Sequence, residues 1–205
     1  MALSIRDVQP HELDSILALN NNAGATILPL DAAALRVLHE QASYFRLAEI
    51  DGHAAGFLAA LREDATYESP NFRWFRDHYG EFAYIDRIVV AKPYRGLGLG
   101  RLFYADVTSY AETHVPLLAC EVFLEPRDDI SLLFHGTWGF QEVGQQTMPA
   151  NGRRVALLAK TLCSFPFVRE TYLEGPLGRL PDLPWLRERA RIDAGAQGTR
   201  AAGGR

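Results

Sequence analysis

The feature that most constrains the fold is a glycine-rich segment, RGLGLG at residues 95–100, which lies between an apolar stretch and a run of helix-forming residues. Residues 82–91, FAYIDRIVVA, have the pattern of a strand, and a helix is expected from about residue 100 to His114. Glycine lacks a Cβ, so the backbone can take positive φ angles there and a ligand can touch the main chain. A strand, this turn and a helix predict a β-α-β unit, whose right-handed crossover leads to a parallel strand.

The other elements follow from hydrophobic periodicity and from turn residues. We expect strands at 3–8, at 43–63 as a pair around Asp51-Gly52, at 116–125, and as a closing hairpin around Asn151-Gly152, with helices at about 11–21, 30–42 and 128–138. Asp31 is the expected N-cap of the second of these helices. This order predicts an α/β fold with a mixed, mostly antiparallel sheet and helices on both faces.

The composition changes after about residue 162. Residues 163–205 are rich in proline, glycine and arginine, which predicts a partly disordered C-terminal extension behind a single domain at residues 1–162. One short helix is expected at roughly 182–193, and disorder in the last dozen residues.

Charge and cysteine content exclude several classes of function. The net charge of −4 disfavours nucleic-acid and anionic-membrane binding, and it slightly favours cationic amine partners. The two cysteines form no CxxC motif and the six histidines show no metal-ligand spacing, so we expect neither a disulfide framework nor a metal site. The sequence shows no signal-peptide pattern and no apolar run of membrane-spanning length, so the expected location is the cytoplasm.

The glycine segment predicts an anion site. At a helix N-terminus the N–H groups of Gly96 through Gly100 point outward, and the helix dipole adds partial positive charge, so phosphate is the natural ligand. Arg95 and Arg101 are expected to reinforce that field.

Three phosphate-binding patterns compete for this segment. A P-loop needs GxxxxGK[ST], and neither the lysine nor the hydroxyl residue is present. A dinucleotide fold needs GxGxxG; Arg101 replaces the last glycine, although Glu121 lies about the right distance downstream, so this pattern is weakened but stays open. The third pattern, [R/Q]xxGx[G/A] between a strand and a helix, fits residues 95–100 at every position.

This third pattern resembles the acyl-CoA site of the GNAT superfamily of N-acetyltransferases. The segment ISLLFHGTWGFQEVG, residues 130–144, is similar to the second signature of that family, and the order of elements over about 3–162 resembles its fold. The sequence looks closest to a bacterial branch of acetyltransferases whose substrates are largely unassigned. The resemblance implies an enzyme that uses acetyl-CoA as co-substrate and transfers acetyl to a primary amine of a small molecule or peptide.

The resemblance also implies which residues contact the cofactor. Backbone groups of the strand before the glycines would pair with the pantetheine arm, and the start of the helix at 128–138 would contact the cofactor as well. The expected contacts are Ile88, Val89, Val90, Arg95, Gly96, Leu97, Gly98, Leu99, Gly100, Arg101, Asp128, Ser131 and Phe134. The family commonly has asparagine where this chain has Asp128, whose charge near phosphate is unfavourable unless Arg127 compensates it.

Acetyl transfer to an amine needs a base and benefits from an acid. Asp86 is the leading candidate base, because alternation places Tyr84, Asp86, Ile88 and Val90 on one strand face that should lead toward the thioester. The alternative is that Asp86 only pairs with a neighbouring arginine such as Arg87 or Arg73, and Glu121 is the second candidate base.

The acid is expected at the position four residues before the Gly-Phe pair, where the family often has tyrosine. This chain has His135 there, and an imidazole with an ordinary pKa of about 6.5 could protonate the CoA sulfur. The alternative is a polar contact without a role in proton transfer.

Residues 67–82 form an aromatic insertion that we expect over the acceptor site. The candidate substrate contacts are Tyr67, Trp74, Phe75, Tyr79 and Tyr84. The alternative for such aromatics is a satellite core or a contact in a homodimer. Two other functions stay open at this point: an acyl-CoA-sensing module without turnover, and a nucleotide-dependent oxidoreductase.

Overall fold

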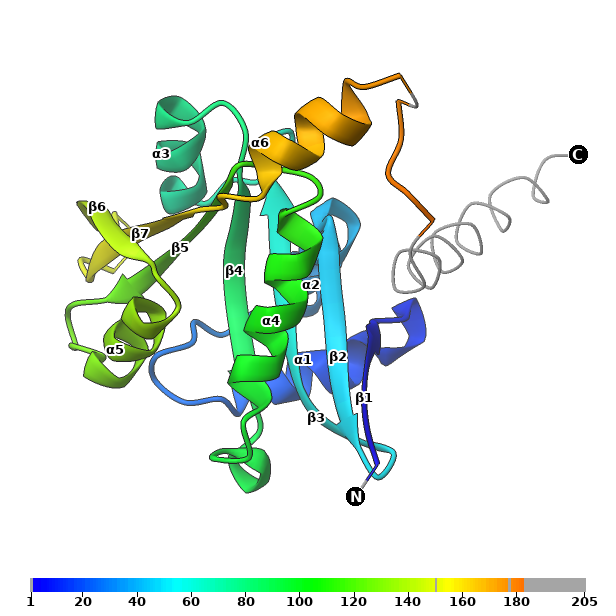
Figure 1. Ribbon diagram of the computed structural model, residues 1–205. Helices are drawn as coiled ribbons and strands as arrows, with labels where there is room; N and C mark the ends of the chain where they lie inside the picture. Colours follow the sequence, from blue (N-terminus) through cyan, green and yellow to red (C-terminus); the bar gives the residue numbers. More distant parts are fainter. Residues whose placement is uncertain (1, 150, 177, 183–205) are drawn as a thin grey trace, which may run out of the picture. The chain divides into compact units, whose positions relative to one another are not determined.

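The structure is a computed structural model that describes residues 2–149, 151–176 and 178–182 of the 205-residue chain. It divides into two compact units, Met1–Phe165 and the residues from Pro166 onward. The first unit holds all the sheet and most of the helices (Figure 1).

Within the described residues, seven strands form one sheet in the order β1-β2-β3-β4-β5-β7-β6. The strands are β1 (Leu3–Asp7), β2 (Tyr44–Ile50), β3 (His53–Arg62), β4 (Ala83–Val90), β5 (Leu117–Phe123), β6 (Gln141–Thr147) and β7 (Arg154–Thr161). Neighbouring strands pair antiparallel, except that β4 and β5 are parallel. The predicted mixed, mostly antiparallel sheet is therefore confirmed, and the dinucleotide fold, which needs a mostly parallel sheet, does not fit.

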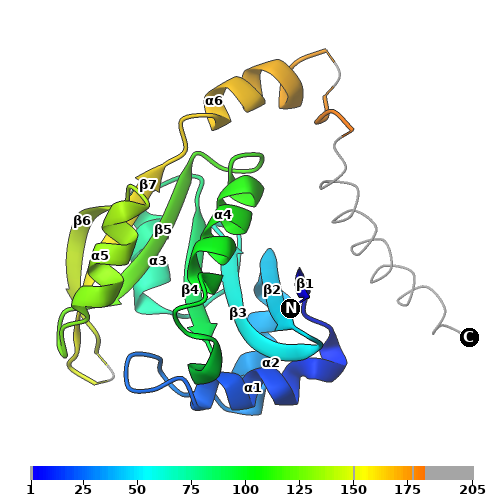
Figure 2. The same cartoon turned by 60° about the horizontal axis from the view of Figure 1, so that its bottom comes forward.

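Helices cover both faces of the sheet, as predicted. They are α1 (Leu13–Asn21), α2 (Ala32–Gln41), α3 (Pro70–His78), α4 (Leu99–Ala111) and α5 (Asp129–Thr137), with 3-10 turns η1 (Pro10–Glu12) and η2 (Lys92–Tyr94). The apolar residues of α1, α2 and α3 belong to one core cluster with one face of the sheet. Figures 1 and 2 show α4 and α5 on the opposite face from α1 and α2.

Local sequence signals explain where several elements begin and turn. Asp31 caps α2 by accepting a hydrogen bond from the Ala34 N–H at 2.8 Å, as predicted. Asp51 and Gly52 take φ angles of 50° and 76°, the left-handed pair that a tight hairpin between β2 and β3 requires.

The aromatic insertion at residues 67–82 contains a helix, α3, that the sequence analysis did not predict. Ser69 caps α3 by accepting from the Phe72 N–H, and Pro70 occupies the first helical position. A serine followed by proline is a recognisable helix start, so the signal was present in the sequence. Phe72 and Phe75 are completely buried in the core.

A buried charge cluster ties α4 to the edge of the sheet. Arg46 on β2 is only 9% exposed, and it pairs with Asp7 at 2.9 Å and with Asp106 of α4 at 3.1 Å. The Tyr44 hydroxyl donates to the same Asp106 carboxylate at 2.6 Å. Because buried charges are stable only when they are paired and hydrogen-bonded, this cluster fixes the position of α4, which carries the glycine segment at its N-terminus.

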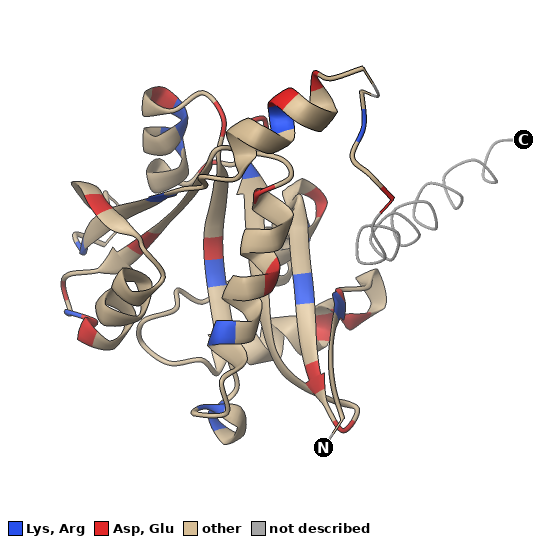
Figure 3. Ribbon diagram, viewed as in Figure 1, with Lys and Arg blue, Asp and Glu red and all other residues tan. Residues whose placement is uncertain are grey.

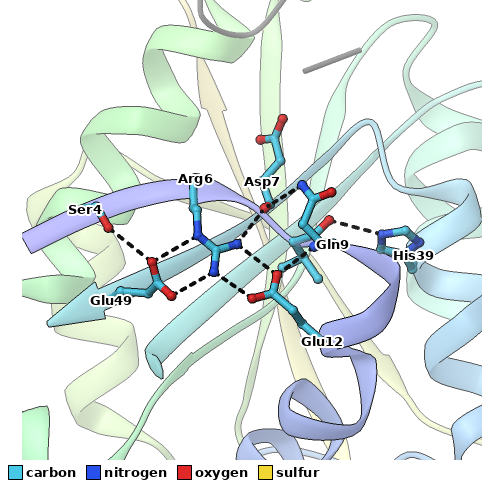
Figure 4. A network of polar contacts seen from close by, with 8 residues as sticks. Ser4, Arg6, Asp7, Gln9, Glu12, His39 and Glu49 are labelled. Carbon is cyan, nitrogen blue, oxygen red and sulfur yellow. Dashed lines mark hydrogen bonds and ion pairs between the residues drawn. The ribbon is translucent and has the colours of Figure 1, made fainter. Parts of the chain in front are cut away.

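A second charge network joins β1, η1 and β2 (Figure 4). The Arg6 guanidinium donates to Glu12 at 2.6 Å and to Glu49 at 2.7 Å. The Glu12 carboxylate also accepts from the Gln9 N–H at 2.8 Å, so it closes the first turn after β1.

The second unit begins within a short helix, α6 (Phe165–Val168), and continues with a π-helical turn at Arg169–Leu173. The helix predicted at about 182–193 and the disorder predicted for the last dozen residues lie outside the described residues.

Candidate active site

The glycine segment forms an open turn at the N-terminus of α4. Gly96 and Gly98 have φ angles of 80° and 85°, and a Cβ at either position would meet no atom within 4 Å. Gly98 is the N-cap and supplies no side chain, and the first helical hydrogen bond runs from the Leu102 N–H to the Gly98 carbonyl. The N–H groups of residues 99–101 therefore have no intrahelical acceptor and face open space, which is the geometry of a phosphate site.

The residues around this turn differ in what they offer a ligand. Leu99 is buried and anchors the helix start, whereas Leu97 and Arg101 are exposed. Gly100 lies against the ring of Phe134 from α5, where an added Cβ would sit 3.6 Å away. The glycine turn and Phe134, which are both predicted to contact the cofactor, thus lie side by side.

Arg95, which was predicted to reinforce the phosphate site, donates hydrogen bonds to two backbone carbonyls. Its Nε donates to the Val90 carbonyl at 3.0 Å and its Nη2 to the Ala23 carbonyl at 2.7 Å. The guanidinium therefore bridges two backbone segments beside the turn, and its expected role in the phosphate field is not what these contacts indicate.

The parallel strands β4 and β5 separate next to the glycine turn. They pair over only three positions and the pairing ends at Ile85 and Cys120. One position further, β4 carries a bulge at Asp86, since Arg87 pairs with Ala59 while Ile85 pairs with Ala60. The β5-facing edge of β4 beyond Ile85 thus carries no β5 partner, which leaves backbone donors and acceptors free for an extended ligand.

The bulge corrects the predicted face of β4. Tyr84 pairs with Leu61, Arg87 with Ala59 and Val89 with Phe57, and all three partners belong to the core cluster under α1 to α3. Directly opposed residues share a face, so Val89 and not Val90 shares the face of Tyr84. The expected alternation over Tyr84, Asp86, Ile88 and Val90 is interrupted by the extra residue.

Asp86 lies in a closed set of contacts. One carboxylate oxygen accepts from Arg87 Nε at 2.6 Å and the other from the Tyr67 hydroxyl at 2.7 Å, and the side chain is only 5% exposed. Arg87 also donates to Asn20 of α1 at 2.8 Å. Figure 3 shows the acidic and basic positions next to each other on β4. The arginine pairing that was the alternative for Asp86 is thus present.

Glu121 on β5 is the second carboxylate at the point where the strands separate. Through the pairings of Tyr84 with Ala119 and of Ala119 with Ala159, it falls on the same sheet face as Tyr84. The Tyr84 hydroxyl donates to its carboxylate. Burial, and then the charge of Asp86, raise the pKa of Glu121 to about 7, and the hydrogen bond from Tyr84 offsets part of that rise.

A carboxylate with a pKa near 7 is suited to take up and release a proton at neutral pH. The sequence contained Glu121 as second candidate, but the burial that raises its pKa depends on tertiary packing, which no local sequence pattern shows. The buried amide of Asn71, which is 1% exposed, is a site residue that sequence reasoning missed entirely.

His135 does not fit the role of a cationic acid. It is 6% exposed, its Nδ1 lies 2.7 Å from the Ser131 carbonyl, and its Nε2 faces the Tyr104 hydroxyl. Burial lowers the pKa of His135, so the imidazole is neutral at pH 7. Nδ1 thus contacts a carbonyl within α5, and Nε2 joins α5 to Tyr104 of α4. These contacts are compatible with the alternative of a polar residue without a role in proton transfer, and the role of His135 stays a prediction.

The start of α5 is capped as the sequence suggested. Asp128 accepts from the Ser131 N–H at 3.0 Å and from its hydroxyl at 2.8 Å. Arg127 pairs with Asp129 at 2.6 Å, so the compensation of Asp128 by Arg127 is not seen. The cofactor contacts predicted for Asp128 and Ser131 stay predictions.

The aromatic residues proposed for the acceptor divide into two groups. Phe75 and Tyr84 are completely buried, and the substrate contacts predicted for them stay predictions. Tyr67, Trp74 and Tyr79 are half-buried, and Trp74 stacks on His78 with ring centroids 3.9 Å apart. Only Tyr67 of this group touches a candidate catalytic residue, through its bond to Asp86.

The described residues contain neither a candidate metal site nor a candidate membrane-spanning helix. No group of three or more histidine, cysteine or acidic side chains there could hold a metal ion. In the same residues, no helix has the length and apolarity to cross a membrane.

Comparison with solved structures identifies the fold. Ard1 from Thermoplasma volcanium superposes with a TM-score of 0.64 at 16% identity, over 79% of this chain and 99% of that one. The ribosomal-protein-S18-alanine N-acetyltransferase from Escherichia coli gives 0.61 at 16% identity, over 78% and 94%. Arabidopsis thaliana Naa50, in complex with the bisubstrate analogue CoA-Ac-MVNAL, gives 0.60 at 15% identity, over 78% and 99%.

At these identities the likeness shows the fold alone. No curated protein matches the sequence. The sequence model described as the Acetyltransferase (GNAT) family, however, matches residues 12–140, which is more than half of the chain and contains both the glycine turn and the end of α5. This chain therefore belongs to the GNAT acetyltransferase family.

Proposed function

We propose that this protein is an acetyl-CoA-dependent N-acetyltransferase that acetylates a primary amine of a small molecule or peptide. The observation that carries the proposal is the position of the half-buried Glu121 side chain where β4 and β5 separate. Along the chain, β4 leads to the glycine turn of α4, whose N-cap has no side chain. A phosphate site, a free strand edge and a titratable carboxylate lie along one path, which is the set of groups that acetyl transfer from CoA to an amine requires.

The cofactor would be held by backbone groups. The N–H groups at the start of α4 would bind its pyrophosphate, and the unpaired edge of β4 over residues 86–90 would bind its extended arm. The Val89 carbonyl points to β3, because a Cβ on Gly56 would lie 2.4 Å from it. Among the predicted positions, Ile88 thus has its backbone groups on the free edge. Val90 also faces this edge, but its carbonyl already accepts from Arg95 Nε.

The chemical step needs a neutral amine, and we assign its deprotonation to Glu121. Glu121 takes one proton from the ammonium ion, and the neutral nitrogen forms the new bond to the carbonyl carbon of acetyl-CoA. The carbon–sulfur bond breaks, and the second nitrogen proton passes to the departing sulfur, which leaves as the CoA thiol. A backbone N–H on the free edge of β4 would polarise the carbonyl oxygen. Asp86 is less suited as the base, because both of its oxygens already accept hydrogen bonds.

Asp86 instead affects Glu121 through its charge, which raises the pKa of Glu121. Its charge is the second cause of the raised Glu121 pKa, and its pair with Arg87 keeps the local charge balanced. The site would therefore carry about one negative charge when Glu121 is ionised, which favours an amine that arrives as an ammonium ion.

The acceptor class guides the choice of assay substrates. Two of the proteins with similar folds are an N-acetyltransferase of the ribosomal-protein-S18 alanine and Naa50, which was solved with the bisubstrate analogue CoA-Ac-MVNAL. A panel for this chain therefore includes a peptide with a free N-terminus, a peptide with only a lysine amine, a polyamine and an aminoglycoside.

Calorimetric titration tests the cofactor. The wild-type protein is titrated with acetyl-CoA, CoA and NAD, and the acetyl-CoA titration is repeated on Gly98→Glu, whose carboxylate would occupy and repel the phosphate site. Gly152→Glu is the matched control, since Gly152 also has a positive φ angle of 67° and open space around it, but lies in the β6–β7 hairpin. We expect saturable acetyl-CoA binding that Gly98→Glu abolishes and Gly152→Glu retains.

The same titration separates the other functions. Selective binding of NAD would contradict the proposal and support the oxidoreductase alternative. Binding of acetyl-CoA without thiol release from any amine of the panel would support the sensing alternative.

A further inference from the structure

The segment between α1 and α2, residues 22–31, is held by arginines that belong to three other parts of the fold. Arg95 donates to the Ala23 carbonyl at 2.7 Å, Arg153 to the Ala25 carbonyl at 3.1 Å, and Arg87 to the Leu28 carbonyl at 3.4 Å. Asn20 at the end of α1 also donates to Leu28, at 3.2 Å. We call residues 22–31 the α1–α2 loop.

Two of these arginines lie beside the proposed catalytic site without being assigned a part in the chemistry. Arg87 pairs with Asp86 beside Glu121, so its second contact places the α1–α2 loop next to the carboxylate cluster. Arg95 is the first residue of the glycine motif, so its contact places the other end of the loop next to the phosphate site. A continuous set of contacts thus leads from the glycine turn, through the loop, to Asp86.

The geometry of Arg95 is that of a bridge. Its Nε binds the carbonyl of Val90 at the end of β4, and its Nη2 binds Ala23 in the loop. A planar guanidinium offers two directed edges for such a pair, whereas a lysine ammonium has a single donor centre.

Apolar packing and a polar bridge both hold this end of the loop. Ala23 is only 8% exposed and belongs to the core cluster, and its carbonyl accepts the Arg95 hydrogen bond. Beside it lies an open pocket of about 690 Å³, lined by Ala18, Leu19 and Asn22 and by Ala91, Lys92 and Pro93. The Arg95 bridge thus adds a directed polar contact between the loop and the end of β4.

We propose that Arg95 is a positioning residue for the α1–α2 loop, which it ties to the cofactor site, rather than a phosphate ligand. The inference rests on the proposed function in one respect: the loop borders the acceptor side only if the Asp86–Glu121 cluster is the site of transfer. Arg95 thereby couples the half of the site that holds acetyl-CoA to the half that receives the amine.

Hydrogen–deuterium exchange of the free protein, together with acetyl-CoA titration, tests this inference. Arg95→Lys keeps the positive charge and removes the two-edged bridge, so we expect amides of residues 22–31 to exchange about five-fold faster, the effect of losing one hydrogen bond of ordinary strength. The Kd for acetyl-CoA should change less than two-fold. Amides of β3 serve as the internal reference for global stability.

Two further variants complete the comparison. Arg101→Gln removes a charge from the first turn of α4 without a contact to the loop, so we expect weaker acetyl-CoA binding and wild-type exchange in residues 22–31. Arg153→Gln releases the Ala25 carbonyl from the β7 side, so we expect faster exchange in the loop and unchanged acetyl-CoA binding.

Wild-type loop exchange in Arg95→Lys would overturn the inference, and so would a several-fold loss of acetyl-CoA affinity in that variant. Failure of the wild-type protein to bind acetyl-CoA would contradict the proposed function instead. The exchange measurement needs no ligand, so the two failures are distinguishable.

Discussion

At the scale of single residues, the same pair of residue types has different consequences in different surroundings. Asp86 and Arg87 form an ion pair with an N–O distance of 2.6 Å, and Arg127 and Asp129 form one of the same length. The first pair has side chains 9% and 5% exposed, whereas both side chains of the second are 65% exposed. Only the first has been removed from water.

This contrast predicts unequal effects of one substitution. Asp86→Asn leaves the buried Arg87 charge without its partner and should lower the free energy of unfolding by about 3 kcal/mol. Asp129→Asn, the matched control, should change it by less than about 1 kcal/mol. Urea denaturation followed by circular dichroism measures both, and equal losses would contradict the assignment of Asp86 and Arg87 to a desolvated cluster.

Prediction from sequence succeeded for residues whose conformation depends on backbone chemistry. It was less successful for residues whose properties depend on packing. Glycines at 96 and 98 predict an open turn, because few other residues adopt positive φ. The properties of Glu121 and His135 depend instead on desolvation by distant segments, and no local pattern contains that information. Burial raises the pKa of Glu121 and lowers that of His135.

At the scale of secondary-structure elements, β3 and β4 approach each other too closely for a side chain at one position. A Cβ on Gly56 would lie 2.4 Å from the Val89 carbonyl oxygen and 3.2 Å from the Val90 Cα, and both are backbone atoms that cannot move aside independently. Gly56→Ala should therefore destabilise the protein by about 2 kcal/mol.

A second glycine gives the control. Gly80 precedes β4, and an added Cβ there would meet nothing within 4 Å. Gly80→Ala should leave stability unchanged or raise it by about 0.5 kcal/mol, because alanine restricts the unfolded chain. Similar urea midpoints for the two variants would show that the strands can separate to accommodate a methyl group.

The network of Arg6 predicts a pH dependence for the junction of β1, η1 and β2. The hydrogen-bonded Arg6 guanidinium lowers the pKa of Glu12 from its ordinary value of 4.5 to about 2. A depressed carboxylate pKa contributes stability above pH 4.5, and that contribution is lost as the pH falls toward 2.

A comparison of Glu12→Gln with the wild type isolates this contribution. The variant should be less stable at pH 6, and the difference in unfolding free energy should shrink as the pH falls from about 4.5 toward 2. A difference that stays constant over this range would contradict the ionic contribution of Glu12. Equilibrium urea unfolding at four or five pH values provides the measurement.

Element-level prediction succeeded for strands and hairpins and missed one helix. The Asp51-Gly52 turn and the alternating strands around it are local signals, and the structure confirms them. The six aromatics at residues 67–82 obscured the Ser69-Pro70 helix start, and the bulge at Asp86 has no signal that strand alternation reveals.

At the scale of the whole molecule, most of the fold could be predicted from the order of the strands and helices along the chain. Strands, helices and one parallel pair could be arranged from sequence because neighbouring elements are adjacent in the sheet for the first four strands. The separation of β4 from β5, which creates the site, is a property of the assembled sheet and could be expected only through family resemblance.

The boundary of the first unit gives a prediction on the complete chain. Sequence composition placed the domain end at residue 162, whereas compactness places it at Phe165, a side chain only 2% exposed. We propose that a chain ending at residue 168 keeps the melting temperature and acetyl-CoA affinity of the full chain. A chain ending at residue 162 should melt at a lower temperature, because it lacks the buried ring. Equal melting temperatures of the two shortened chains would contradict this boundary.

The central claim is that Glu121 accepts the amine proton in an acetyl transfer, and the pH dependence of thiol release from acetyl-CoA tests it most directly. With an amine that the panel identifies as acceptor, wild-type kcat/KM should rise with pH through a midpoint near 7, since the base works only when deprotonated. Glu121→Gln should lower kcat/KM about a hundredfold or more and abolish that rise, while the exposed control Glu142→Gln keeps both. A Glu121→Gln variant with the wild-type rate and pH profile would contradict the account.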